Sequence, residues 1–304
     1  QYLADYVALT HQMLVQLGIR PERLRFRQHL PDERAHYATD CWDAEIYSDR
    51  FGWVETVGIA DRTDYDLRAH ERQSGERFSV FIPYDTPRRE SRIRVVPDMG
   101  ALGPRFRGNA RAVAEALCAT VPGPEGLTVT IDGNPVRITP DLYTVKEEVV
   151  EVPGAEVVPH VIEPSYGIDR MIYAVLEHSY FEEMVEGEER RVLRLPPGIA
   201  PVQVAVLPLM NRDGLPEIAG EIVEDVRGQG ILAQYDDSGA IGRRYRRQDE
   251  VGTPFAITVD YETREDQTVT LRDRDSMRQV RVPIEGIGSF VRSLIEGRRS
   301  FAGL

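Results

Sequence analysis

The chain has 304 residues, of which 41% are hydrophobic and 29% are charged, so it can build ordinary folded cores and is not a disordered protein. Its net charge of −13 argues against binding nucleic acid by overall charge, although a local basic strip stays compatible with it. No apolar run is long enough for a transmembrane helix, and Cys41 and Cys118 form no CxxC pair. We therefore expect about two domains, a cytoplasmic location, no membrane contact, no metal site and no protein-bound zinc.

Apolar residues at helical spacing predict a first helix over residues 2–18. The chain begins with Gln1 rather than Met and this helix has already started, so we expect an excised piece of a longer protein. No element is assigned to residues 21–30, and residues 34–40 are expected to form a loop. Strands over 43–47 and 53–60, joined by a polar turn, predict an antiparallel hairpin.

The middle of the chain reads as an insertion in a larger domain, from about residue 88 to 157. Residues 73–108 carry few periodic signals. A short helix is expected over 109–119, and a second hairpin is expected around the turn sequence Asp-Gly-Asn-Pro at 132–135. The strands of that hairpin are predicted over 127–131 and 136–139. A strand over 157–163 and a helix over 166–184 are predicted to follow.

A linker at 194–200, with the sequence RLPPGIA, separates a first domain (1–195) from a second one (200–304). The second domain is expected to have the order βαβαβββα, which indicates a compact mixed sheet. Its predicted elements are the strands 202–207, 231–235, 255–260, 268–271 and 280–283 and the helices 217–229, 239–247 and 285–296.

The segment VIEPSYGIDRMIY at 161–173 carries the clearest chemical signal. In a strand, Glu163 and Ser165 lie on the same face because side chains alternate. Arg170 falls in the first turn of the following helix, where the helix dipole disfavours a cation by ~0.3–1 kcal/mol. A phosphate held by Arg170 and a salt bridge to Asp169 or another carboxylate would each offset that cost, and both interpretations stay open.

Common nucleotide-binding sequences are absent. No GxGxxG opens a predicted helix, and Lys146, the single lysine of the chain, lies in no glycine-rich loop. A bound nucleotide would have to be held by arginine.

The segment 161–173 resembles motif 3 of the class II aminoacyl-tRNA synthetases in its glycyl form. Further segments resemble archaeal and eukaryotic glycyl-tRNA synthetases, in one order and over almost the whole chain. These segments are DCWDAE at 40–45, GWVETVGIADRTDYDL at 52–67, IGRRYRR at 241–247 and LRDRDSMRQ at 271–279.

The resemblance implies a role for individual residues. Arg170 would be catalytic and would hold the γ-phosphate of ATP, while Glu163 and Ser165 would bind glycine. Glu55 would lie next to both substrates, and Thr56 and Gly167 would belong to the ATP site. The implied reaction forms glycyl-adenylate from glycine and ATP, with substrate-bound Mg²⁺, and then transfers the glycyl group to tRNA-Gly. The implied complete protein is a homodimer.

The implied fold class is α+β. A partial class II antiparallel sheet with flanking helices would be followed by an α/β mixed-sheet domain that resembles an anticodon-binding domain. In the second domain Tyr245 lies within a basic strip that could contact tRNA phosphates and stack a base. The same strip could equally be a solvated helix face paired with nearby carboxylates. The strip comprises Arg243, Arg244, Arg246 and Arg247.

Motifs 1 and 2 of the class II enzymes are not found in the chain. We therefore expect the second half of a glycyl-tRNA synthetase, which alone does not activate glycine because the α-phosphate arginine of motif 2 is missing. The alternatives are a non-catalytic, synthetase-like tRNA-binding or accessory subunit and a sister synthetase for another amino acid. The synthetase is favoured over these alternatives because the chain retains residues of an amino-acid and ATP site, which a pure binding module does not need. These residues are Glu55, Glu163, Ser165 and Arg170.

Overall fold

The computed structural model describes residues 1–120, 123, 126–131 and 134–304. The chain divides into two compact units, one formed by Gln1–Tyr65 together with His160–Leu304 and the other by Asp66–Pro159. Within the described residues, no helix is both long and apolar enough to cross a membrane.

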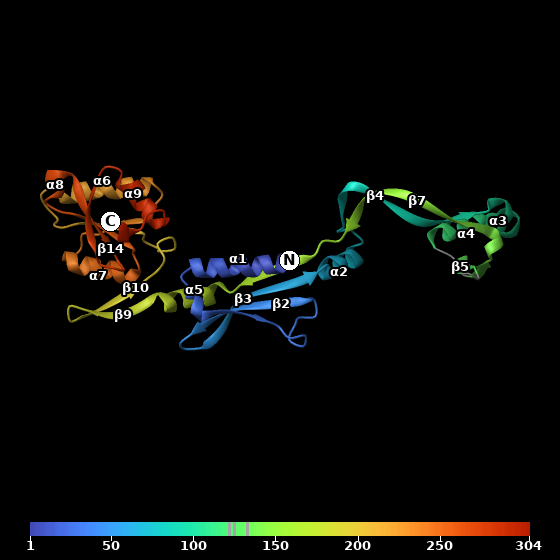
Figure 1. Cartoon of the computed structure of the whole chain (residues 1–304), viewed down its shortest axis with the longest axis horizontal. Helices are drawn as coiled ribbons and strands as arrows, with labels where there is room; N and C mark the ends of the chain where they lie inside the picture. Colours follow the sequence, from blue (N-terminus) through green and yellow to red (C-terminus); the bar gives the residue numbers. More distant parts are fainter. Residues whose placement is uncertain (121–122, 124–125, 132–133) are drawn as a thin grey trace. The chain divides into compact units, whose positions relative to one another are not determined.

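The first unit begins with a four-stranded antiparallel sheet in the order β1-β2-β3-β8 (Figure 1). Two helices, α1 and α5, pack on one face of this sheet. The bounds are α1 Tyr2–Gln16, β1 Leu24–Gln28, β2 Asp40–Ser48, β3 Gly52–Thr63, β8 Val161–Tyr166 and α5 Ile168–Ser179.

Side chains alternate between the two faces of each strand, so one face of this sheet is apolar and packs against the helices α1 and α5. One face of β2 and β3 presents buried apolar residues, which pack against Leu14 of α1 and Met171 of α5. The opposite face presents mainly charged and small residues. The apolar set on the strands comprises Ala44, Ile46, Val57 and Ile59. The predicted first hairpin is thus confirmed, while residues 24–28, which carried no prediction, form a further strand.

The helix predicted over 166–184 is too long, because α5 ends at Ser179 and a hairpin follows. Its strands are β9 (Tyr180–Val185) and β10 (Glu188–Leu193), joined through Glu186 and Gly187, whose φ values of +52° and +86° suit a tight turn. The strand predicted over 157–163 spans the end of one strand and the start of another, since β7 reaches Val157 and β8 begins at Val161.

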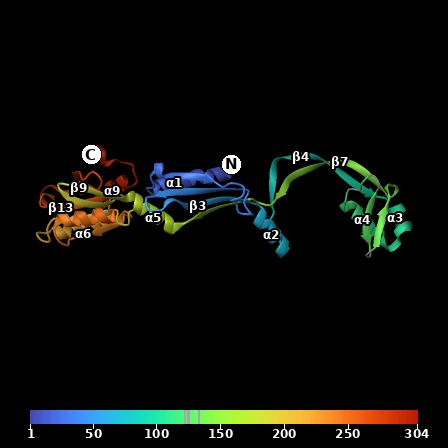
Figure 2. The same ribbon diagram turned by 90° about the horizontal axis from the view of Figure 1, so that it is seen from below.

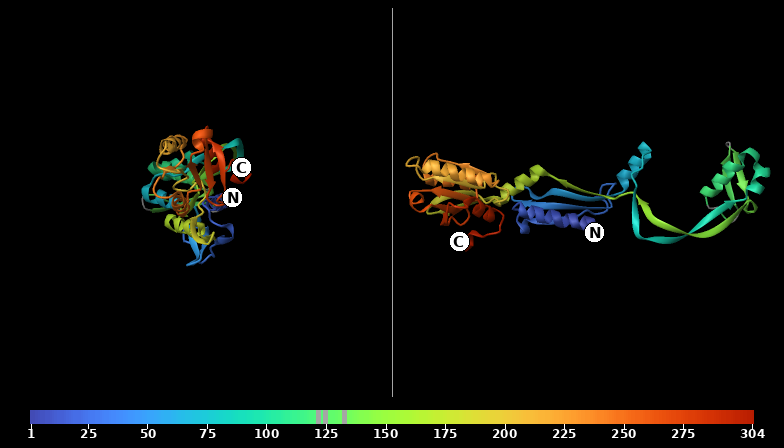
Figure 3. Two further views of the ribbon diagram at one scale, coloured as in Figure 1. Left: turned by 90° about the vertical axis from the view of Figure 1, so that its left-hand side faces the viewer. Right: turned by 90° about the horizontal axis from the view of Figure 1, so that it is seen from above.

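The second unit contains a long two-stranded antiparallel ribbon, β4 and β7, drawn in teal and green in Figures 2 and 3. At the end where Pro97 pairs with Tyr143, two helices and a hairpin close a small core. The bounds are α2 Tyr65–Ser74, β4 Val80–Pro97, α3 Met99–Phe106, α4 Ala110–Ala119, β5 Leu127–Ile131, β6 Asn134–Ile138 and β7 Tyr143–Val157.

The sequence missed β4 because most of its residues are exposed, so no apolar alternation marks it. The predicted insertion, about 88–157, lies inside this unit, which begins earlier, at Asp66. The predicted second hairpin is present as β5 and β6, but Asp132 and Gly133 of its expected turn lie outside the described residues.

The C-terminal part of the first unit contains a five-stranded mixed sheet in the order β12-β11-β13-β14-β15. The first three strands run parallel and the last two antiparallel. The bounds are β11 Val204–Pro208, α6 Leu215–Gly228, β12 Ala233–Tyr235, α7 Ile241–Val251, β13 Phe255–Val259, α8 Thr263–Asp266, β14 Thr268–Asp273, β15 Gln279–Pro283 and α9 Ile287–Ile295.

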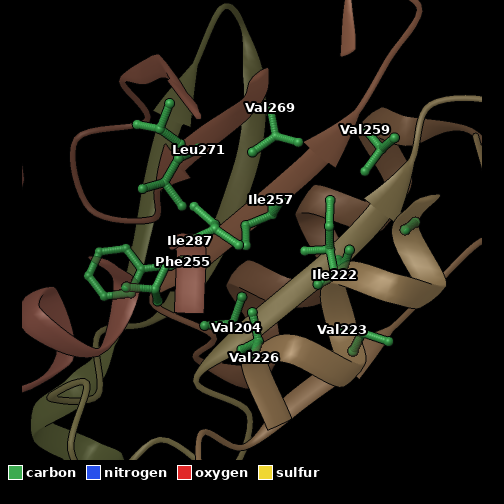
Figure 4. Close-up of a cluster of buried hydrophobic side chains, with 14 of the residues drawn as sticks. Val204, Ile222, Val223, Val226, Phe255, Ile257, Val259, Val269, Leu271 and Ile287 are labelled. Carbon is green, nitrogen blue, oxygen red and sulfur yellow. The ribbon is translucent and has the colours of Figure 1, made fainter. Parts of the chain in front are cut away.

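Helices cover both faces of this sheet. The helices α6 and α9 close the main core, in which Ile222, Val226 and Ile287 meet Val204 and Ile257 of the central strands (Figure 4). On the other face, α7 packs against Ala205 and Leu207 of β11 and Ala256 of β13. The predicted succession of elements in this part of the chain and the α+β fold class are both confirmed; the four-residue helix α8 is an addition.

Candidate active site on the polar face of the first sheet

The polar face of the first sheet carries three rows of side chains, because residues paired across antiparallel strands share a face. A β-bulge in β3 at Thr56 shifts the register so that Glu55, rather than Thr56, joins this face. The rows, read from β1 to β8, are Arg25, Glu45 and Glu55; then Arg27, Asp43, Gly58 and Ser165; then Cys41, Ala60 and Glu163.

The predicted glycine-binding residues therefore lie on one face of one sheet. Ser165 and Glu163 on β8 pair with Gly58 and Ala60 of β3, and Glu55 lies one row away on the same strand. The carboxylate of Glu163 receives a hydrogen bond from Arg62 Nη1 at 2.6 Å, a partner that the sequence did not reveal. Glu55 and Ser165 are exposed.

The bulge residue Thr56 ties the sheet to the start of α5. Its side chain is only 3% exposed and donates a hydrogen bond to the carbonyl oxygen of Ala44 at 2.9 Å. Its carbonyl oxygen accepts the N–H of Gly167 at 2.8 Å. A Cβ on Gly167 would lie 3.1 Å from that oxygen, which explains the glycine. Thr56 is also among the residues that line a hollow formed by Glu55, Asp169 and Arg170, and the ATP-site roles of Thr56 and Gly167 stay predictions.

Arg170 is anchored beside Glu55. Its Nη1 donates to the carbonyl oxygen of Glu55 at 2.8 Å, and its side chain is exposed. Among the described residues, no carboxylate lies within ion-pair distance of Arg170, so the salt bridge to Asp169 is not formed. The rest of the guanidinium is free to bind an anion.

A hollow of about 600 Å³ opens beside the first half of β3. Glu55, Asp169 and Arg170 line it together with mainly apolar side chains of β2, β3 and α5. Glu163 and Ser165 do not line it. The predicted residues thus form two neighbouring groups, one at the hollow and one on the sheet face.

Asp43 is a functional candidate that the sequence did not single out. It is only 5% exposed, and its Oδ2 atom contacts His29 Nε2 at 2.6 Å and Arg27 Nη2 at 3.6 Å. The alternation of charged residues in β1 and β2 would have revealed this face if β1 had been recognised as a strand.

One group of described residues offers metal-ligand atoms close together: those of His29, Cys41 and Asp43 lie within 4.8 Å of one another. Asp43 already binds two cationic or donor groups through one oxygen. Burial, and then the carboxylates of Asp43 and Asp40, raise the pKa of the Cys41 thiol.

The basic strip on α7 divides into buried and exposed members. Arg244 is 3% exposed and donates to the carbonyl oxygens of Gly239 and Pro208, so the structure removes it from the surface that RNA could reach. Arg247 pairs with Asp236 at 2.6 Å. Arg243 is exposed, and Arg246 lies 3.9 Å from Glu188.

Tyr245, predicted to be able to stack on a base, instead packs on the sheet face covered by α7. Its hydroxyl lies 2.5 Å from Thr258 Oγ1. Burial raises the pKa of this phenol. The ring is therefore not free to bind a base.

Comparisons with known proteins agree with this architecture. The anticodon binding domain family matches residues 203–294. A glycine–tRNA ligase of Methanothrix thermoacetophila is 54% identical over 99% of this chain, and one of Archaeoglobus fulgidus is 50% identical over 98%. A third, from Methanocaldococcus jannaschii, is 46% identical over 97%.

This chain belongs to the glycine–tRNA ligase family. The similarity extends over the sheet that carries the candidate site as well as over the anticodon-binding domain. The chain spans about half the length of the relatives it matches, namely 53% of the first two and 52% of the third. Identity near 50% along the whole chain supports the resemblance drawn from its motifs.

Proposed function

We propose that the complete protein is a glycine–tRNA ligase that forms glycyl-adenylate and transfers the glycyl group to tRNA-Gly. The observation that carries this proposal is the hydrogen bond from the Arg170 guanidinium to the backbone carbonyl oxygen of Glu55, next to the bulge, while the exposed Glu55 carboxylate and the guanidinium each have no ion-pair partner among the described residues. An adenylating enzyme must bind an ammonium group beside a polyphosphate, and these two groups have the required charges.

The chain's own residues would act by positioning and charge rather than by covalent chemistry. Glu163, Ser165 and Glu55 would bind glycine, and Arg170 would hold the γ-phosphate of ATP. Mg²⁺ would accompany ATP and neutralise its phosphate charge. Of the described residues that line the hollow, Asp169 offers the carboxylate oxygens that this ion prefers, because Glu55 would bind glycine.

Residues 203–294 would bind the anticodon region of tRNA-Gly. The exposed Arg243 and the half-buried Arg246 of α7 are the members of the basic strip that support this role. We also propose that the complete enzyme is a cytoplasmic homodimer, as the family resemblance implies.

The test is glycine-dependent ATP–pyrophosphate exchange by the whole ligase and by its Arg170→Ala variant. We expect the substitution to reduce exchange by about 100-fold or more, because it removes a cation from the transition state. Arg191→Ala is the matched control, since Arg191 is an exposed arginine of β10 far along the chain from the site.

The isolated 304-residue chain is a second arm of the test. It is expected to catalyse no exchange. If the whole natural protein also fails to activate glycine but binds tRNA-Gly, the tRNA-binding or accessory function replaces the ligase.

A further inference from the structure

The segment 194–200, predicted to be a linker, is packed rather than free in the structure. Leu195 is 5% exposed and Ala200 is 1% exposed. The carbonyl oxygen of Leu195 accepts a hydrogen bond from Arg274 Nη1 at 3.0 Å. A Cβ on Gly252, the residue that ends α7, would lie 2.8 Å from Leu195 Cδ1, so the segment lies directly against the end of this helix. Contacts therefore fix the connection that leads into the C-terminal domain.

The β9–β10 hairpin, which precedes this segment, is anchored to the part of the chain that carries Arg170. No loop separates it from α5, since the last residue of α5 directly precedes β9. The guanidinium groups of Arg20 and Arg194 lie over the ring of Phe181 on β9, at 5.1 and 4.5 Å from its centroid. Arg20 Nη2 also donates to the carbonyl oxygen of His178 at 2.9 Å. The base of the hairpin is therefore held both by α5 and by the segment before β1.

The second strand of the hairpin is anchored to the C-terminal domain by a buried arginine network, which comprises Arg190, Asp249, Arg272 and Arg274. Asp249 of α7 is 1% exposed and receives hydrogen bonds from Arg190 Nε at 2.9 Å and from Arg272 Nη1 at 2.8 Å. Arg190 is fully buried, and its Nη2 donates to the carbonyl oxygen of Arg274 at 2.6 Å. Planar guanidinium groups donate in fixed directions, so these contacts specify an orientation as well as a distance.

Stability alone does not account for burying these charges. Apolar residues of similar volume often stabilise a protein as much as a buried ionic network or more, because charges lose their hydration on burial. Directional ion pairs instead select a single arrangement of the elements that they join, whereas domains with ordinary interfaces move relative to one another. The arginine network therefore holds α7 in one orientation relative to the β9–β10 hairpin, and so relative to α5.

The helices α7 and α5 each carry an arginine of a proposed tRNA or ATP site, Arg243 and Arg170. A ligand that binds a protein at two places gains strongly from the second contact when the two places are held at the span of the ligand. It gains nothing when the geometry forbids both contacts at once. A tRNA that is bound at its anticodon and charged at its 3′ end is such a ligand.

We propose that Arg190 is a positioning residue for the transfer of glycine to tRNA. With Asp249 it holds the anticodon-binding domain in the orientation in which one tRNA-Gly contacts both this domain and the site beside Arg170. This inference rests on the proposed ligase function and deepens it. Arg190 is buried and does not line the hollow beside Arg170, so it acts on the charging of whole tRNA and not on the formation of glycyl-adenylate.

The test compares the whole ligase with its Arg190→Met variant, at a temperature well below both melting temperatures. Three quantities are measured: glycine-dependent ATP–pyrophosphate exchange, the Kd for an RNA stem–loop with the anticodon of tRNA-Gly, and KM for whole tRNA-Gly in charging. We expect KM for whole tRNA-Gly to rise by about 10-fold or more, since linked contacts raise overall affinity by about 10²–10⁴-fold. Exchange and the stem–loop Kd should each change by less than about 2-fold, because neither needs both sites at once.

Arg191→Met is the matched control, because Arg191 follows Arg190 in β10 but its side chain is 58% exposed and pairs with the exposed Glu189. It should leave all three quantities unchanged. Arg190→Lys is a second variant, which keeps the charge but lacks the planar fork of donors. It should raise KM for whole tRNA-Gly selectively, by a smaller factor, and it replaces Arg190→Met in the comparison if that variant does not fold.

The outcomes separate this inference from the proposed function. If the unmodified ligase charges no tRNA-Gly, the function itself fails. If it charges tRNA-Gly and neither variant raises KM for whole tRNA-Gly, the function stands and the positioning role is wrong. An equal loss of exchange, stem–loop binding and charging would give Arg190 a purely structural role and would also overturn the inference.

Discussion

The polar face of the first sheet and the C-terminal domain are both rich in charged side chains, but they use them differently. On the sheet face, Glu55 and Arg170 keep their charged groups free of ion pairs among the described residues. Around α7, Arg190 is fully buried and donates to Asp249 Oδ2 at 2.9 Å, to Glu183 and to the carbonyl oxygen of Arg274. Both regions contain ion pairs, such as Arg62 with Glu163 on the sheet face, but the sheet face also leaves the charged groups of Glu55 and Arg170 unpaired among the described residues.

This network also connects two elements that the sequence placed in different domains. Arg190 belongs to β10, before the predicted linker at 194–200, while Asp249 belongs to α7, after it. Arg272 donates to the same carboxylate at 2.8 Å, so Asp249 is shared by two arginines. The β9–β10 hairpin is therefore fastened to the C-terminal domain.

Breaking the network should give the largest effect on stability. Arg190→Met removes the buried cation from the network and leaves Asp249 with Arg272 as its remaining ion-pair partner among the described residues, while Glu183 keeps Arg194. We expect the free energy of unfolding to fall by about 3–5 kcal/mol, because removing one partner of a buried ion pair has an effect of that size. Urea denaturation measures the change.

Arg191→Met is its control, because the Arg191 side chain is 58% exposed and pairs with the exposed Glu189. Little or no change in the free energy of unfolding is expected there, because ion pairs between solvated side chains contribute little. If both substitutions lowered the free energy of unfolding equally, the distinction between the buried, paired Arg190 and the solvated Arg191 would be wrong.

The next effect concerns activity on the sheet face. Glu55→Gln in the whole ligase should lower glycine-dependent exchange by about 100-fold, because a neutral amide no longer attracts the ammonium group. The free energy of unfolding should hardly change, since the carboxylate has no protein partner to lose. Glu250→Gln, an exposed glutamate of α7, serves as the control in the exchange assay. Full activity of Glu55→Gln would remove Glu55 from the site.

The basic strip of α7 allows a comparison within one helix. Arg243→Ala should weaken tRNA-Gly binding by a few fold and reduce its salt dependence, because one exposed charge is lost. Arg244→Ala should instead lower stability by about 1.5–3 kcal/mol, because its hydrogen bonds to Gly239 and Pro208 disappear. Filter binding at several salt concentrations and thermal unfolding measure the two effects. If Arg243→Ala lowered stability and Arg244→Ala weakened tRNA-Gly binding, the roles assigned to these residues from their burial would be wrong.

The smallest effect is a pH dependence of the C-terminal domain. Burial alone would raise the pKa of Asp236, but the hydrogen bond from Arg247 and the backbone N–H of Ser238 outweigh it and hold this pKa below its ordinary value of 3.8. A lowered pKa in the folded state means that the pair stabilises the protein above about pH 4 and that this contribution disappears as pH falls through the folded pKa.

The contribution of this pair is about 1 kcal/mol or less, as for other partly exposed ion pairs. Arg247→Met should flatten the loss of stability between about pH 4 and pH 2 relative to the unmodified protein. Unfolding curves over this range give the slope, and an unchanged slope would contradict the assignment.

Much of the site was accessible from the sequence. The alternation in β8 correctly placed Glu163 and Ser165 on one face, and the position of Arg170 at the start of α5 indicated an anion site. The sequence missed Asp43 and Gly58, because β1 was not recognised and because the bulge at Thr56 reverses which residues of β3 share a face. A one-residue shift of register is invisible to alternation alone.

The sequence by itself determined the amphipathic strands, the helices of the C-terminal domain and the family, since these depend on local periodicity and on motifs. The tertiary structure decided which charges are free. Arg244 and Arg243 are one position apart and identical in type, yet only the first is buried. Ion pairing depends on residues far apart in the chain, such as Arg190 and Asp249, and only folding brings them within hydrogen-bond distance.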